Sequence, residues 1–97
     1  MLRKDTKYFY GYISSSKLRR KILETLYNHS TLRQTEIANK LNQKQQNISK
    51  AVYDLEREKL IECLNPEKSA WKSYMITDLG KEVILFAKER EEEVKNR

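Results

Sequence analysis

The chain has 97 residues, of which 35% are charged and 38% are apolar, and its formal net charge is +6 with only two glycines and one proline. This composition suits one helix-rich globular domain over residues 1–97 and is too apolar for a disordered chain. The single cysteine excludes an intramolecular disulfide and a cysteine-rich zinc site. The absence of a long apolar run or a signal-peptide pattern predicts a cytoplasmic protein without a membrane partner.

The N-terminal stretch "KYFYGYI" is unusually aromatic. Four aromatic residues fall within five positions, and these are Tyr8, Phe9, Tyr10 and Tyr12. Aromatic side chains stack on bases in RNA-binding modules, and they are also frequent at protein interfaces. Because this stretch lies outside the helix-turn-helix predicted below, we expect its aromatic residues to lie in an interface or in the core.

Three amphipathic segments follow. The first covers residues 14–28, where serines suited to N-capping precede an apolar side, and the second is a short helix at 35–41. The third, at 45–62, has the clearest pattern. Its apolar residues recur at the spacing of a helical turn, and these are Ile48, Ala51, Val52 and Leu55. The second and third segments, joined by a few polar residues, predict a helix-turn-helix.

A β-hairpin and a closing helix complete the expected order. Residues 61–64 and 73–77 read as two short strands around a loop that contains the only proline. Residues 78–95 read as the last helix. The sequence therefore predicts a mainly α winged helix-turn-helix domain with a small β-hairpin, in which residues 14–77 form the core.

The ordered motifs "EIA", "IS", "LE", "LI", "Y..T" and "GKEV" within residues 35–83 resemble the winged helix-turn-helix transcriptional regulators of the ArsR/MarR type, especially archaeal ones. The resemblance covers roughly residues 14–84. Family members often place Ser or Thr before each of the two helices, whereas Arg33 and Lys44 stand near those points here, with Thr31 and Asn42 as alternative caps. The metal-sensing branch uses cysteine pairs, which Cys63 alone does not supply.

The predicted recognition helix begins in the stretch "NQKQQN", which has no acid and no apolar residue. On a helical projection, Gln46, Lys50, Tyr53 and Arg57 lie within about 30° of the direction opposite the apolar side. Amides pair with adenine and lysine donates to guanine. An ordinary solvated face usually mixes Glu with Lys, so DNA reading is favoured. The candidate contacts are Lys44, Gln45, Gln46, Asn47, Ser49, Lys50, Tyr53 and Arg57.

The loop of the hairpin would place Lys68 and Lys72 against phosphates. Trp71 is a candidate for the same contact, although a lone tryptophan more often packs under the wing, and packing is slightly favoured. In the last helix, "VILFA" is apolar nearly all the way round, so a second surface should cover Leu85 and part of Ile84. We expect a homodimer formed there, with help from the aromatic residues 8–12.

The sequence contains no nucleophile–base pair, no Gly-rich phosphate loop and no paired carboxylates, which argues against an enzyme and against a cofactor or metal site. Cys63 is expected to be a small buried side chain, and His29 has no neighbouring ligand set. The favoured function is sequence-specific binding of double-stranded DNA by a transcriptional regulator. A winged-helix adaptor for protein or RNA is the alternative, because the fold also serves that role. A regulator that responds to a small-molecule effector is a third possibility and would need a pocket.

Overall fold

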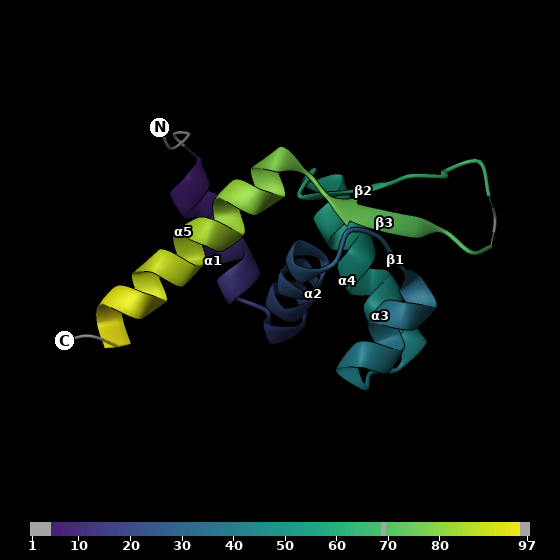
Figure 1. Ribbon diagram of the computed structural model, residues 1–97, viewed down its shortest axis with the longest axis horizontal. Helices are drawn as coiled ribbons and strands as arrows, with labels where there is room; N and C mark the ends of the chain where they lie inside the picture. Colours follow the sequence, from purple (N-terminus) through teal and green to yellow (C-terminus); the bar gives the residue numbers. More distant parts are fainter. Residues whose placement is uncertain (1–4, 69, 96–97) are drawn as a thin grey trace.

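The amphipathic repeats form the expected helix-turn-helix in the computed structural model, which describes residues 5–68 and 70–95 (Figure 1). The helices in this part of the chain are α1 (Thr6–Ser14), α2 (Lys17–Asn28), α3 (Gln34–Leu41), α4 (Gln45–Arg57) and α5 (Asp78–Lys95). The strands are β1 (Leu32–Arg33), β2 (Ile61–Cys63) and β3 (Ser73–Ile76). The mainly helical winged-helix prediction is confirmed, while α1 and β1 were not predicted.

Helix α4 buries the apolar side that its sequence predicted. Ile48 and Leu55 are fully buried, and Ala51 and Val52 are nearly so. They pack with α2, α3 and the sheet in one continuous core. This face holds α4 in place and leaves its other side in solvent.

The turn between α3 and α4 differs from the expected capping. Helix α3 ends at Asn42, which adopts a left-handed conformation with φ 52°, a conformation that asparagine tolerates better than most residues. Asn42 therefore caps the end of α3 and does not begin α4, and Thr31 lies before β1 and is not the cap of α3. Helix α3 begins after Arg33, whose backbone N–H donates to the Glu36 carboxylate at 2.8 Å.

The three strands form an antiparallel sheet in the order β1-β3-β2. Strands β2 and β3 are the predicted hairpin, and their register pairs Ile61 with Ile76. The short strand β1 pairs on the other side of β3, with Leu32 opposite Tyr74 and Arg33 opposite Ser73. This pairing brings the start of α3 next to the wing, which is the loop between β2 and β3.

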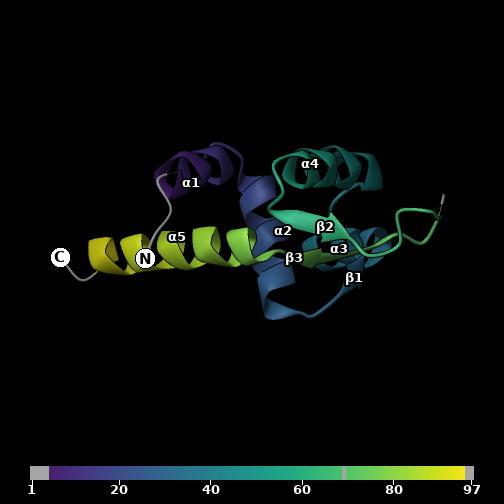
Figure 2. The ribbon, with the colours of Figure 1, turned by 90° about the horizontal axis from the view of Figure 1, so that it is seen from above.

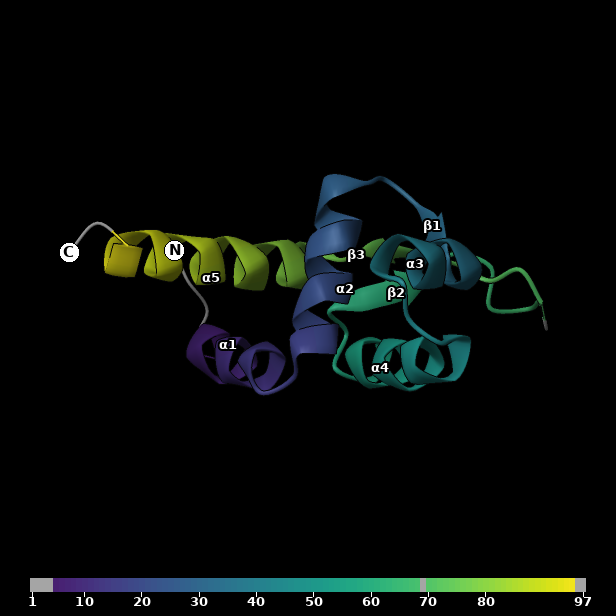
Figure 3. The same ribbon diagram turned by 90° about the horizontal axis from the view of Figure 1, so that it is seen from below.

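Helix α2 passes through the middle of the molecule, with α1 and α5 on one side of it and α3, α4 and the sheet on the other (Figures 2 and 3). The molecule is elongated, with extents of 45 × 27 × 21 Å. The wing projects at one end and the last turns of α5 at the other (Figure 1). No helix within residues 5–68 and 70–95 is long and apolar enough to cross a membrane.

A close approach at Gly80 fixes the start of α5. A Cβ there would lie 2.2 Å from the backbone oxygen of Leu60 and 2.6 Å from Cγ1 of Ile76. The Gly80 N–H also donates to the Thr77 hydroxyl at 3.0 Å, so Thr77 caps the helix. Only glycine fits between α5 and the sheet at this point.

Helices α1 and α5 pack together through aromatic side chains. The rings of Tyr10 and Phe86 meet edge to face with centroids 5.6 Å apart. Phe9 and Ile84, which were expected at a dimer interface, are buried in the core of the chain itself. Phe9 is buried because α1 is a helix, so Phe9 and Ile13 point inward together from one face. Ile84 is buried beside Val83 and Ala87 on the inner face of α5. Tyr8 and Leu85 remain exposed.

Candidate nucleic-acid interface

The exposed side of α4 carries the residues that its helical projection placed there. Gln45, Gln46 and Asn47 are exposed over its first turn, and Lys50 is exposed one turn later. Tyr53 and Arg57 continue the same side toward the end of the helix. The polar side of α4 is therefore open to a partner along its length.

The start of α4 is electropositive. Lys44 stands at the N-cap without a side-chain hydrogen bond, and the first turn contains no acid. The free N–H groups of a helix start carry partial positive charge, which is normally offset by a capping oxygen or an acid. Here that charge adds to the Lys44 ammonium, so an anionic partner would be attracted to this end.

One predicted contact residue is already engaged within the chain. The Gln34 side-chain amide donates a hydrogen bond to the Ser49 hydroxyl, which joins α3 to α4. Ser49 therefore faces α3, and Gln45 and Gln46 are better placed than Ser49 to reach a groove.

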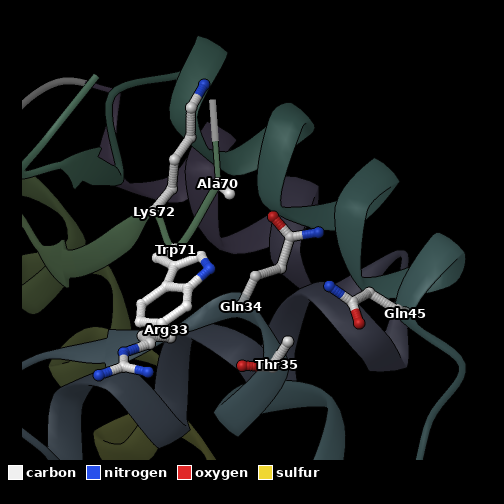
Figure 4. A pocket seen from close by; sticks show the side chains of 7 residues that line it. All are labelled: Arg33, Gln34, Thr35, Gln45, Ala70, Trp71 and Lys72. Carbon is white, nitrogen blue, oxygen red and sulfur yellow. The ribbon is translucent and has the colours of Figure 1, made fainter. Parts of the chain in front are cut away.

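Two hollows flank the start of α4. The first, of about 270 Å³, lies toward α2. It is lined by Ser16, Leu18, Arg19, Gln46, Asn47, Lys50, Ala51 and Asp54. The second, of about 500 Å³, lies toward the wing and the start of α3. It is lined by Arg33, Gln34, Thr35, Gln45, Ala70, Trp71 and Lys72 (Figure 4). Gln46 and Asn47 thus border the hollow toward α2, and Gln45 borders the hollow toward the wing.

Tyr12 connects α1 to α4 and was not expected to do so. Its hydroxyl donates to the backbone oxygen of Asp54 at 3.3 Å. Its ring lies 4.1 Å from the Arg19 guanidinium, and Arg19 also donates to its backbone oxygen at 2.7 Å. A hydrogen bond to Tyr12 raises the pKa of Arg57, which links this exposed guanidinium to α1. Tyr12 therefore helps to hold α4 in place, and its part in a dimer interface stays a prediction.

Asp54 is the one acid on this part of α4, and it is paired. Its carboxylate lies 3.8 Å from the Lys50 ammonium and 3.9 Å from Nε of Arg19. Because Asp54 is half-buried between these two cations, it positions them more than it repels an anion. The acid that lies nearest the start of α4 in space is therefore paired with two cations.

The wing places Lys68 and Trp71 in solvent and leaves Lys72 half-exposed. Trp71 is 74% exposed, so the packing interpretation is wrong. Its indole lies beside Arg33, with the guanidinium carbon 5.2 Å from the ring centroid (Figure 4). Sequence reasoning missed Arg33 because its position depends on β1, a strand of two residues with no period to read.

The two remaining residues that the sequence singled out are Cys63 and His29. Cys63 is half-buried, with Sγ 3.6 Å from Oδ1 of Asn65, and His29 is exposed. In the part of the chain that the structure describes, no group of three or more His, Cys, Asp or Glu residues is placed to hold a metal ion.

A helix-turn-helix with an open polar second helix and a β-wing defines a winged helix-turn-helix protein. The model of the MarR family matches residues 16–68, which is more than half of the chain. The chain belongs to the MarR family. No curated protein matches the sequence at a significant level.

Solved structures share the fold. A MepR A103V mutant from a multidrug-resistant S. aureus clinical isolate superposes with a TM-score of 0.76 at 24% identity, over 84% of this chain and 60% of that one. The MarR family transcription regulator SP03579 gives 0.69 at 30% identity, over 80% and 52%. An S. aureus MepR–DNA complex gives 0.62 at 28% identity, over 84% and 73%. The chain thus spans 60% and 52% of the length of the first two.

Proposed function

We propose that this chain binds double-stranded DNA in a sequence-specific manner as a transcriptional regulator, and that it acts as a homodimer without catalytic activity. The observation that carries the proposal is the start of α4, where exposed amides and Lys44 surround an uncapped, acid-free helix end. Such an end attracts phosphate and presents groups that read base edges. The solved complex of S. aureus MepR with DNA supports this proposal for a chain of the same family.

Each part of the interface has a distinct task in this proposal. Gln46 and Asn47 enter the major groove, where a side-chain amide pairs with adenine through one donor and one acceptor. Lys50 reaches a guanine edge or the backbone, and Lys44 lies near phosphate. Lys68 and Lys72 of the wing contact phosphates, which orient the domain without reading sequence.

The other end of the molecule supports the dimer. Leu85 on α5 is 45% exposed and Tyr8 on α1 is 61% exposed, on the two helices that pack together there. We infer that a second copy of the chain covers these two side chains, which lie on neighbouring helices. Two-fold symmetry would then present two α4 helices to two half-sites on one duplex. The archaeal and ArsR-like parts of the resemblance stay predictions.

The test is selection of bound duplexes from a random pool, followed by affinity measurements over a range of salt. We expect a single enriched motif with two-fold symmetry and a Kd that rises steeply with salt for both motif and random DNA. Lys44→Ala should weaken both to a similar degree. Lys7→Ala, which removes the same charge from an exposed position on α1, is the matched control and should change neither.

The adaptor alternative gives the opposite result. A protein- or RNA-binding winged helix would enrich no duplex motif, and any duplex binding would be weak and insensitive to the side chains of α4. Enrichment from an RNA pool alone would contradict the proposal directly.

A further inference from the structure

Trp71, the only tryptophan in the chain, stands in solvent at the base of the wing. Its backbone is left-handed, with φ 65°, a region that bulky residues rarely adopt. An indole that is 74% exposed gains little from burial, so packing does not account for this conformation. Strain of this kind is often retained where a side chain must be presented to a partner.

The side chain of Asn65 holds Trp71 in this conformation. Nδ2 of Asn65 donates to the backbone oxygen of Trp71 at 3.1 Å, and Oδ1 accepts from the N–H of Ser73 at 2.8 Å. One amide thus fixes the backbone on both sides of Lys72. Asn65 is half-buried across the wing from Trp71, so it sets the direction of the indole without contacting a partner itself.

Arg33 supplies a cation beside the indole. The pairing of β1 with β3 sets Arg33 opposite Ser73, and its guanidinium carbon lies 5.2 Å from the Trp71 ring centroid. Within residues 5–68 and 70–95, no carboxylate lies within ion-pair distance of this guanidinium. The aromatic ring therefore orients the guanidinium group, and its positive charge is available to an anion.

The Arg33–Trp71 pair forms one wall of the hollow of about 500 Å³, and Gln45 of α4 lies on the opposite side (Figure 4). With α4 in a major groove and the wing on the neighbouring backbone, a DNA strand would pass between these walls. A deoxyribose has an apolar C–H face and an anionic phosphate on the same unit. The indole matches the first and the guanidinium matches the second.

We propose that Arg33 and Trp71 together bind one deoxyribose–phosphate unit of the duplex, with the sugar against the indole and the phosphate on the guanidinium, and that Asn65 is the positioning residue. This inference rests on the proposed function. It adds a contact that is sequence-independent and, at Trp71, independent of salt, in contrast to the lysine contacts of the wing.

The intrinsic fluorescence of Trp71 tests the inference in the unmodified protein. A fluorescently labelled duplex is titrated with protein while anisotropy reports binding, and acrylamide quenching of Trp71 emission is measured on the same samples. We expect the quenching constant to fall as anisotropy saturates, because the sugar covers the indole. Unchanged anisotropy would reject both the proposed function and this inference. Saturated anisotropy with unprotected Trp71 would reject this inference alone.

Three variants then assign the roles. Trp71→Ala should weaken binding to cognate and random duplexes by the same factor, roughly threefold to tenfold, without changing the slope of log K against log salt. Arg33→Ala should weaken both and lower that slope by about 0.9. Asn65→Ala should shift the emission and quenching of Trp71 in the free protein and weaken DNA binding as Trp71→Ala does. Asn28→Ala, at an exposed amide on α2, is its control and should do neither.

Two results would show that something other than a deoxyribose–phosphate unit contacts Trp71. Stronger protection of Trp71 by single-stranded DNA than by duplex would mean that an unpaired base stacks on the indole. A change of sequence preference in Trp71→Ala would mean that the wing reads bases.

Discussion

The two ends of the molecule leave different kinds of side chain uncovered. Around the start of α4 and the wing, the exposed groups include amides, ammonium groups and one indole beside a guanidinium, together with Leu64 and Glu67 of the wing. Around α1 and α5, the exposed residues include Leu85 and Tyr8. Polar groups with partial positive charge suit a hydrated anion, whereas apolar side chains suit another protein surface. In the proposed function, the first of these surfaces meets DNA and the second meets another copy of the chain.

The ends are also joined by fixed contacts. Arg20 of α2 donates two hydrogen bonds to the Glu91 carboxylate of α5, one of them at 2.7 Å, and these bonds raise the pKa of Arg20. Tyr12 links α1 to α4 on the other side of α2. Variants at each end test how separate the two surfaces are.

The largest effect is expected at the apolar end. Leu85→Glu should raise the Kd of the dimer by at least about 100-fold, since symmetry places the lost apolar contact and the new charge in the interface twice. Sedimentation at roughly tens of micromolar measures this. Lys81→Glu, which introduces the same side chain at an exposed position of α5, is the control. A wild-type protein that sediments as a monomer would contradict the dimer. A dimer whose Kd is unchanged by Leu85→Glu would show that Leu85 lies outside its interface.

The stability of the fold should be sensitive to one methyl group at Gly80, where α5 meets the sheet. Gly80→Ala forces a Cβ against the Leu60 backbone oxygen, so it should lower the free energy of unfolding by about 2–3 kcal/mol. Gly11→Ala is the matched control. No atom lies within 4 Å of its added Cβ, and alanine favours a helix, so it should raise stability by about 0.5–1 kcal/mol. Urea unfolding of both variants checks the opposite signs.

At the polar end, a single amide should carry sequence information. Gln46→Ala is expected to weaken binding to the selected motif by about 1–3 kcal/mol and binding to random DNA by much less. The side chain is exposed and outside the buried face of α4, so the unfolding free energy should not change. Affinities for both duplexes at one salt concentration measure the ratio. An unchanged ratio would show that the amide does not read a base.

The smallest effect is expected from the wing lysines. Lys72→Ala or Lys68→Ala should weaken binding to every duplex by a similar small factor and flatten the slope of log K against log salt by about 0.9. Salt titrations with motif and random DNA provide the measurement. If sequence preference changed at constant slope, the lysines would be reading bases.

How much the sequence predicted depends on the range of the interactions involved. Helix α4 and its exposed side were predictable because Ile48, Val52 and Leu55 repeat at helical spacing, and burial confirms that pattern. Helix α1 was not predicted because four aromatic residues within five positions are typical of interfaces as well as of a core. The signal that was overlooked is the four-residue spacing of Phe9 and Ile13, which share the buried face.

The wing surface could not be predicted in the same way. The exposure of Trp71 depends on the Asn65 amide, and the place of Arg33 depends on β1, so both are set by contacts between distant parts of the chain. The same holds for Tyr12, whose partners lie on α2 and α4. Composition and period describe one segment at a time and contain no information on such contacts.

The position of β1 in the sheet has a consequence for how the chain folds. Strands β2 and β3 are neighbours in sequence, but β1 precedes them by the whole helix-turn-helix and pairs with β3 from there. Closing a long loop costs chain entropy before the contact is gained, so we expect this pairing to form late, after α3 and α4 have packed. The surface beside Arg33 and Trp71 would then be completed only when most of the molecule is already native. The exposed side of α4 would therefore form before the neighbouring surface at Arg33 and Trp71.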